Sequence, residues 1–237
     1  MKPLVRCFSM FIWQISKDGM LYAVCIAPFL AACFFRFGIP YIETLLCGYF
    51  GKASILADYY LLVDLFLAVL TPFLFCFASS MVILTEFDEN MTAYIAVTPV
   101  GKRGYILSRL VFPAIISYVV SIMLIFSFAL TVWPLPLILS TCMLTSILGI
   151  AVSLLLVSFS HNRVEGMAVS KLSGIIMLGI PVPFFLFSGI QYLFSFLPSF
   201  WIAKLCKEDN YSYMIPALLT SFLWMWVLYG RFEKKVS

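Results

Sequence analysis

The sequence predicts an all-α integral membrane protein with six transmembrane helices, and three observations lead to this prediction. First, 63% of the 237 residues are hydrophobic and only 11% are charged, whereas soluble domains carry about 25% charged residues. Second, the mean hydropathy is +1.07. Third, apolar runs of membrane length alternate with polar segments that are too short to bury the core of a soluble domain.

The first predicted element is an amphipathic helix at residues 1–18 that lies in the membrane interface on the cytoplasmic side. Leu4, Phe8, Phe11 and Ile15 recur at helical spacing, and polar residues occupy most of the remaining surface. This pattern is typical of a helix that lies along a membrane rather than crossing it. We expect the helix to break at Asp18-Gly19.

Residues 19–237 are predicted to form one six-span transmembrane domain. The segment 40–59 is too polar to span and is expected to lie on, or dip into, the outer surface, and 189–205 is again semi-apolar. Pro181 and Pro183 interrupt the fifth span, because proline removes a backbone donor and clashes with the preceding turn. The spans are expected at about 20–36, 60–84, 105–132, 137–159, 167–187 and 213–229.

Six spans place both chain ends on one side of the membrane, and the distribution of cations indicates which side. The segments on the side of the termini hold eleven of the 15 lysines and arginines. Cytoplasmic segments carry an excess of these residues, so both termini are predicted to be cytoplasmic. The four cations expected outside are Arg36, Lys52, Lys204 and Lys207.

A charged segment lies between spans 2 and 3, where Glu86, Asp88 and Glu89 fall within four positions. In lipid each charge would cost roughly 2.5 kcal/mol or more, so the segment is expected in water or against another protein. The pattern of 89–97 suits a short amphipathic helix that Pro99 ends. Two interpretations remain: an ordinary cytoplasmic loop, or a helix that docks on a soluble partner and carries force into both spans.

Two motifs give the chain a family resemblance. Leu84-Thr85-Glu86-Phe87-Asp88-Glu89, followed by Val97-Thr98-Pro99-Val100, resembles the "L-x-E-x-D-E … V-T-P-L" motif after span 2 of type-2 ATP-binding-cassette (ABC) permeases. Asn162-Arg163-Val164-Glu165-Gly166-Met167-Ala168-Val169-Ser170-Lys171 is similar to the "N-K-V-E-G-x-A-x-x-K" element that opens span 5 in the fluoroquinolone-exporter-like branch. The resemblance covers essentially the whole chain.

The resemblance implies that the segment between spans 2 and 3 is the coupling helix, which binds a cleft on a separate ABC ATPase subunit. It also implies a bacterial inner-membrane location, an N-terminal helix along the inner leaflet, and semi-apolar hairpins that cap the outer ends of spans 1 and 5. A second permease, identical or paralogous, would complete the transporter. Carried over by position, the coupling residues are Glu86, Asp88, Glu89, Thr92, Thr98 and Pro99.

No cofactor is expected on this chain, because the sequence lacks a phosphate-binding P-loop. Gly51-Lys52 is followed by Ala53, and Leu46 stands where the motif needs its first glycine. ATP and Mg²⁺ are therefore expected on the partner subunit. No basic face suited to nucleic acid is present either.

Further candidate residues have two interpretations each. Arg163 and Glu165 either contact a partner subunit or are ordinary charges at a helix start. Asp64 is either a solvated interface residue or a cation-attracting group at the exit of a transport pathway. The helix break at Pro181 and Pro183 leaves backbone groups unpaired, and in lipid such groups must be satisfied by other parts of the protein or by a water-filled cavity. The break therefore marks a possible transport pathway. With a single histidine, His161, no catalytic triad or metal-ligand set can be argued.

We therefore expect the permease subunit of an ATP-driven exporter of a hydrophobic or amphipathic compound. The alternative is a membrane anchor or regulatory subunit that recruits an ATPase without moving cargo. An enzyme embedded in the membrane is disfavoured, because no polar constellation for catalysis is present.

Overall fold

The computed structural model describes residues 2–89, 91, 101–186 and 188–236, and every regular element in this part of the chain is helical. Side chains are described except at 2–4, 101–103 and 233–236. Five helical segments in these ranges are long and apolar enough to cross a membrane, which confirms the all-α membrane fold. They are Gly19–Phe50, Ala57–Asp88, Gly104–Phe128, Leu135–Phe159 and Tyr211–Phe232.

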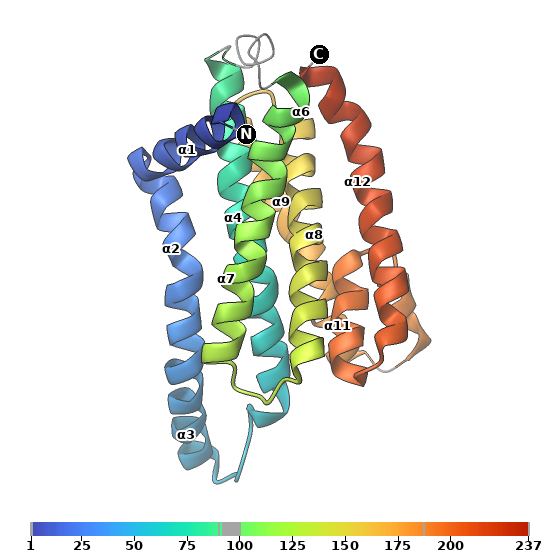
Figure 1. Cartoon of the computed structure of the whole chain (residues 1–237). Helices are drawn as coiled ribbons and strands as arrows, with labels where there is room; N and C mark the ends of the chain where they lie inside the picture. The colour runs from blue at the N-terminus through green and yellow to red at the C-terminus, as the bar shows by residue number, and fades with distance from the viewer. Residues whose placement is uncertain (1, 90, 92–100, 187, 237) are drawn as a thin grey trace.

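The first helix, α1 (Lys2–Lys17), lies across one end of the bundle and meets α2 (Gly19–Cys33) at a sharp corner (Figure 1). Asp18 forms this corner as the N-cap of α2, since its Oδ1 accepts hydrogen bonds from the backbone N–H of Met20 at 3.0 Å and of Leu21 at 3.2 Å. A side-chain acceptor satisfies donors that a helix start otherwise leaves unpaired. The predicted break at Asp18-Gly19 is thus confirmed.

The first span is longer than predicted. A π-helical turn (η1, Phe34–Gly38) joins α2 to α3 (Ile39–Phe50), so one helical segment runs from Gly19 to Phe50. The first eleven residues of the segment 40–59 therefore continue the first helix, and the place of this segment at the outer surface stays a prediction. Pro40 follows the π-helical turn directly, and such a local adjustment accommodates a residue that cannot donate to the preceding turn. The helix ends at Gly51, whose φ of +64° favours glycine.

The centre of the bundle is α4 (Tyr60–Asp88), packed against α8 (Leu135–Phe159) and α7 (Phe112–Phe128) (Figure 1). Gly149 of α8 allows close approach, because a Cβ there would lie 2.9 Å from Cys76 Sγ and 3.1 Å from the carbonyl oxygen of Pro72. The predicted second span ended at residue 84, yet α4 continues one turn further to Asp88. The predicted third span reached residue 132, yet α7 ends at Phe128.

The predicted fifth span is not a continuous helix. It consists of α9 (Arg163–Ser173), a 3₁₀ segment (η4, Gly174–Gly179) and the four-residue α10 (Val182–Phe185). Side chains of α11 (Pro198–Glu208) satisfy carbonyl groups in this broken stretch: Ser199 Oγ donates to Ile176 O, and Lys207 Nζ donates to Pro183 O at 2.6 Å. A helix break in a membrane was expected to be satisfied by protein or by a cavity, and here side chains of the protein satisfy it.

The broken stretch α9–η4–α10 starts at the α1 end of the bundle and leads toward the end where α11 lies (Figure 1). The last helix, α12 (Met214–Val236), returns to the end where α1 lies, so the first and last helices meet the same end. The end of α4, α6 (Gly101–Ile106) and the start of α9 lie there too, whereas α3 and α11 lie toward the opposite end. The remaining short segments are η2 (Ala57–Tyr59), η3 (Leu107–Val111), η5 (Gly189–Phe194) and η6 (Tyr211–Tyr213).

The close contact between η4 and α11 gives a first prediction. A Cβ at Gly179 would lie 2.7 Å from the backbone nitrogen of Phe200, whereas a Cβ at Gly174, in the same 3₁₀ segment, meets nothing within 4 Å. We expect Gly179→Ala to lower the free energy of unfolding by about 1–3 kcal/mol, because backbone cannot move aside as a side chain does. Gly174→Ala is the matched control and should unfold as the wild type. Thermal unfolding in detergent micelles measures both, and equal stability of the two variants would contradict the contact.

Candidate functional site

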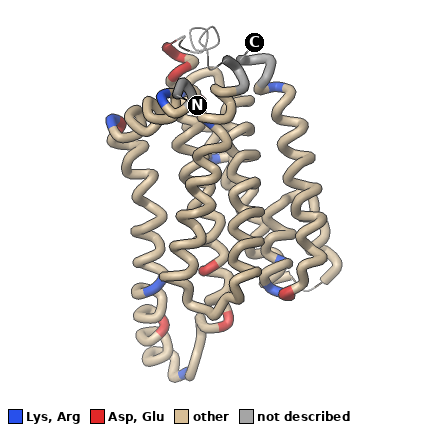
Figure 2. Tube along the Cα trace, viewed as in Figure 1, with Lys and Arg blue, Asp and Glu red and all other residues tan. Residues whose placement is uncertain are grey.

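Charged residues are found mainly at the two ends of the bundle, and the end that carries α1 holds the acidic segment identified in the sequence (Figure 2). At this end α1, α4, α6 and α9 come together. The candidate site is the set of polar contacts that joins these four helices.

A buried ion pair lies at the centre of the site. Glu86, in the last turn of α4, and Arg109, in the π-helical segment η3, are each only 1% exposed. Arg109 Nη2 lies 2.5 Å from Glu86 Oε1, and Arg109 Nε donates to Glu86 Oε2 at 3.1 Å. Two parallel contacts of this kind form the strongest geometry available to an arginine–carboxylate pair.

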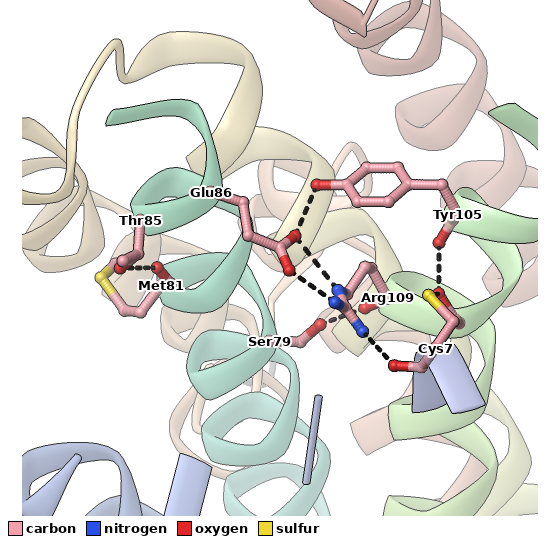
Figure 3. Close-up of polar contacts among 8 residues, drawn as sticks. Cys7, Ser79, Met81, Thr85, Glu86, Tyr105 and Arg109 are labelled. Carbon is pink, nitrogen blue, oxygen red and sulfur yellow. Dashed lines mark hydrogen bonds and ion pairs between the residues drawn. The ribbon is translucent and has the colours of Figure 1, made fainter. Parts of the chain in front are cut away.

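Three further residues complete the pair into what we call the ion-pair cluster: Cys7, Ser79 and Tyr105 (Figure 3). Tyr105 Oη donates to Glu86 Oε2 at 2.9 Å, and Arg109 Nη1 donates to the backbone oxygen of Cys7 at 3.1 Å. Ser79 Oγ donates to the backbone oxygen of Arg109. The cluster therefore fastens α1, α4 and the start of α7 to one another.

The surroundings explain how charges persist at this depth. The Arg109 guanidinium lies 5.1 Å from the ring centroid of Phe11 on α1, within cation–π range. Removing two charges from water is costly, and only good pairing geometry with further hydrogen bonds repays that cost. The π-helical turn around Arg109 also matters, because such insertions change the direction of side chains and are frequent at functional sites.

The structure corrects the prediction for Glu86. Its carboxylate was expected in water or against another protein, but it is buried within its own chain. The physical reason is Arg109, which neutralises the charge without solvent. Glu86 is the first of the predicted coupling residues, and its burial leaves it almost no surface for a partner.

The next two acidic residues are exposed, as predicted for a segment in water or against a partner. Asp88 Oδ2 accepts a hydrogen bond from the backbone N–H of Arg163 at 3.1 Å, and Glu89 follows as the C-cap of α4. The candidate residues Thr92, Thr98 and Pro99 lie outside the described residues.

A second, partly exposed ion pair joins the same end of the bundle. Arg163 Nη2 lies 2.5 Å from Asp18 Oδ2, with 27% and 24% of the two side chains exposed. Burial by itself raises the pKa of the Asp18 carboxyl, but hydrogen bonds from Arg163 and from the backbone of Leu21 outweigh it and lower that pKa below its ordinary value. Together with the Asp88 contact, Arg163 ties the start of α9 to the α1–α2 corner and to the end of α4.

Glu165 supports the start of α9. Its side-chain Oε2 accepts from the backbone N–H of His161 at 2.6 Å, while its own backbone N–H donates to Asn162 Oδ1 at 2.8 Å. This arrangement is similar to a capping box, except that the carboxylate accepts from His161, the residue before the N-cap Asn162. Glu165 is exposed, so its contact with a partner subunit stays a prediction.

Asp64 is not solvated, contrary to the first interpretation. It is 1% exposed and accepts hydrogen bonds from the backbone of Leu130 at 2.8 Å, from the backbone and hydroxyl of Thr131, and from Trp133 Nε1 at 3.2 Å. Both carboxylate oxygens thus hold the turn after α7, which ends that helix before the predicted boundary. A role for Asp64 in a pathway stays a prediction, as it does for Pro181 and for the buried Pro183.

Sequence reasoning missed Arg109, Tyr105 and Asp18. Arg109 was counted only as one of the inner cations, although an arginine inside an apolar run demands a partner, and this signal was available. Tyr105 and Asp18 gave no comparable signal, because a tyrosine at a span start and an aspartate before a helix are common.

Comparisons with known proteins agree with the resemblance noted in the sequence. A family model described as fluoroquinolones export permease protein Rv2686c-like matches residues 11–229. Two Mycobacterium tuberculosis proteins, fluoroquinolones export permease protein Rv2686c of strain ATCC 25618 / H37Rv and fluoroquinolones export permease protein MT2760 of strain CDC 1551 / Oshkosh, are each 28% identical over 88 residues. This stretch covers 35% of the chain and 35% of the length of each relative. No solved structure matches the chain.

The structure of the ion-pair cluster predicts that the effects of Glu86 and Arg109 on stability depend on each other. We expect Arg109→Met to lower the free energy of unfolding by about 3–5 kcal/mol, because Glu86 is left buried without its cation. The double variant Glu86→Met, Arg109→Met removes both charges and should recover most of that loss. Arg231→Met changes an exposed cation at the same end and serves as the control. Equal losses in the single and double variants, measured by thermal unfolding in micelles, would contradict the pairing.

The Asp18–Arg163 pair predicts that the difference in stability between the wild type and Asp18→Asn depends on pH. Asp18→Asn keeps an N-cap for α2 but removes the charge, so it should cost at most about 1 kcal/mol at pH 7. Because the pKa of Asp18 is lowered in the folded state, the wild type should lose this advantage as pH falls through that pKa, below 3.8. Unfolding of both proteins between pH 7 and pH 3 measures the difference in their free energies of unfolding. A difference that does not change with pH would rule out a charge effect.

Proposed function

Since the chain belongs to the Rv2686c-like fluoroquinolones export permease family, we propose that it is the membrane permease subunit of an ATP-driven exporter. Its cargo would be a hydrophobic or amphipathic compound, with fluoroquinolones as the first class to test. ATP and Mg²⁺ would bind a separate ABC ATPase subunit, and this chain would act as a transport subunit rather than an enzyme.

The observation that carries the proposal is the ion-pair cluster on both flanks of the predicted coupling segment. Glu86 lies before residues 89–100, and Tyr105 and Arg109 lie after them. A force applied to that segment would reach α4, α7 and, through Cys7, α1 together, because buried charge-assisted contacts join them. An ordinary loop between two spans needs no such connection.

We place the ATPase against Asp88, Glu89, Thr92, Thr98 and Pro99, with Arg163 and Glu165 as a second contact. Asp88 and Glu89 are exposed, and Arg163 lies beside Asp88. Glu86 holds these residues in position and does not itself touch the partner.

The orientation proposed for the chain follows from its cations. Eleven of the 15 lysines and arginines belong to segments at the α1 end of the bundle or to α9, which starts there. This end therefore faces the cytoplasm, according to the positive-inside rule. The location that fits is the inner membrane of a bacterium, with both termini cytoplasmic.

A second permease, identical or paralogous, would pack against the α9–η4 face. Val164, Leu172, Ile175 and Leu178 are exposed there, and so is Lys171, a cation that lipid would not tolerate well. The transport pathway would run between the two permeases, near the break at Pro181 and Pro183. The second span, α4, is less suited to line this pathway, because most of its residues are buried within this chain.

The alternative function is a membrane anchor or regulatory subunit that recruits the ATPase without moving cargo. The broken stretch α9–η4–α10 favours transport, because a passive anchor gains nothing from interrupting a span. ATP-dependent uptake of a fluoroquinolone into inverted vesicles that contain this chain and its ATPase distinguishes the two functions.

The coupling proposal predicts a selective loss of transport. Glu89→Lys and Pro99→Ala should each reduce the ATP-dependent flux at least about tenfold while membrane insertion and thermal stability stay unchanged, since about 1.4 kcal/mol of lost coupling suffices. The reversed charge repels a site built for a carboxylate, and the lost proline removes a helix stop.

Asp58→Lys is the matched control, because it makes the same charge reversal at an exposed residue of the opposite end. Normal flux in both Glu89→Lys and Pro99→Ala would remove the coupling proposal.

A further inference from the structure

A large open cavity lies at the corner between α1 and the spanning helices, at the end of the bundle that holds the ion-pair cluster. Its volume is about 590 Å³, within the range of small-ligand sites. Residues of α1, the start of α2, the end of α4 and Arg163 of α9 line it. None of the contacts described above fills this space.

The lining of the cavity is amphipathic. Met10, Leu21 and Val82 supply apolar surface, and Trp13 and Lys17 of α1 lie beside them. Lys17 Nζ lies 3.8 Å from the Trp13 ring centroid. Tryptophan and lysine are typical of the level where lipid head groups meet the hydrocarbon, so the cavity opens at that level.

The charges of the cavity are balanced. Arg163 and Asp18 are paired with each other, and Lys17 and Glu89 contribute one further cation and one further carboxylate. A balanced site favours a ligand that is itself neutral overall but carries separated charges, because a net ionic ligand would leave one sign uncompensated.

Two buried polar atoms of the lining lack a hydrogen-bond partner among the described residues: Gln14 Oε1 and Arg163 Nε. Buried polar atoms are nearly always paired, so a bound molecule or water is expected to complete them. Arg163 Nε needs an acceptor, such as a phosphate oxygen, and Gln14 Oε1 needs a donor, such as an ammonium group; both atoms are covered by protein, so the two side chains must turn toward the cavity to meet a ligand. The two requirements differ, and a zwitterion meets both.

We propose that this cavity binds the head group of a zwitterionic phospholipid with a primary ammonium group, taken from the leaflet in which α1 lies. The phosphate lies between Lys17 and Arg163, and the ammonium faces Gln14 and Glu89. The acyl chains leave along the apolar side of the cavity into the membrane. The bound lipid fills the corner between α1 and α4 and holds α1 against the bundle. This site is argued from the cavity and not from the proposed transport function, although Glu89 and Arg163 belong to both proposals.

The test uses the full-length protein purified in a neutral maltoside detergent and native mass spectrometry at increasing lipid concentration. The probe is dihexanoyl phosphatidylethanolamine, and phosphoethanolamine without acyl chains is the soluble competitor. We expect one lipid per chain, with an apparent Kd at least about tenfold higher in Lys17→Gln and in Arg163→Gln, since each removes a charge-assisted contact to the phosphate.

Lys171→Gln removes an exposed cation of α9 that does not line the cavity, and it should bind like the wild type. If Arg163→Gln does not fold, Lys17→Gln alone decides, because Lys17 is exposed on the rim. Unchanged binding in Lys17→Gln would overturn the proposal. Equal binding of phosphoethanolamine would overturn the lipid as the occupant, and equal binding of dihexanoyl phosphatidylglycerol would overturn the requirement for an ammonium group.

Discussion

The structure depends on one constraint above all: Glu86 and Arg109 can be buried only together. Each is 1% exposed, and each would be prohibitively costly alone in so apolar a protein. Their pairing fixes the end of α4 against the start of α7, and the bond from Arg109 to Cys7 adds α1. Three elements distant in the sequence therefore have one relative arrangement at this end of the bundle.

The same rule, that polar groups inside the bundle must find partners within the protein, operates at the other end. Asp64 ends α7 by accepting bonds from the turn that follows it. Ser199 and Lys207 of α11 supply donors to the carbonyl groups of the broken fifth span. In lipid no water can do this, so each interruption of a helix is matched by a side chain from another element.

The ion-pair cluster and the side-chain hydrogen bonds of the fifth span hold different parts of the bundle together. The ion-pair cluster joins the end of α4 to the segment α6–η3 that leads into α7, which is the connection that the proposed coupling requires. The stretch α9–η4–α10 is held by hydrogen bonds from side chains rather than by a continuous helical ladder. Arg163 connects the two parts, since it contacts both Asp18 and Asp88.

The sequence by itself determined the all-α membrane fold, the amphipathic first helix, the corner at Asp18-Gly19 and the position of the acidic segment, because hydropathy and helical spacing are local properties. Only the tertiary structure decided that Glu86 is buried, that the first helix continues past Pro40, that Asp64 closes a turn and that the fifth span is broken but satisfied. Each of these depends on a partner from another part of the chain or on a backbone adjustment such as a π-helical turn. Such pairings are formed in space, and no periodicity along the sequence encodes them.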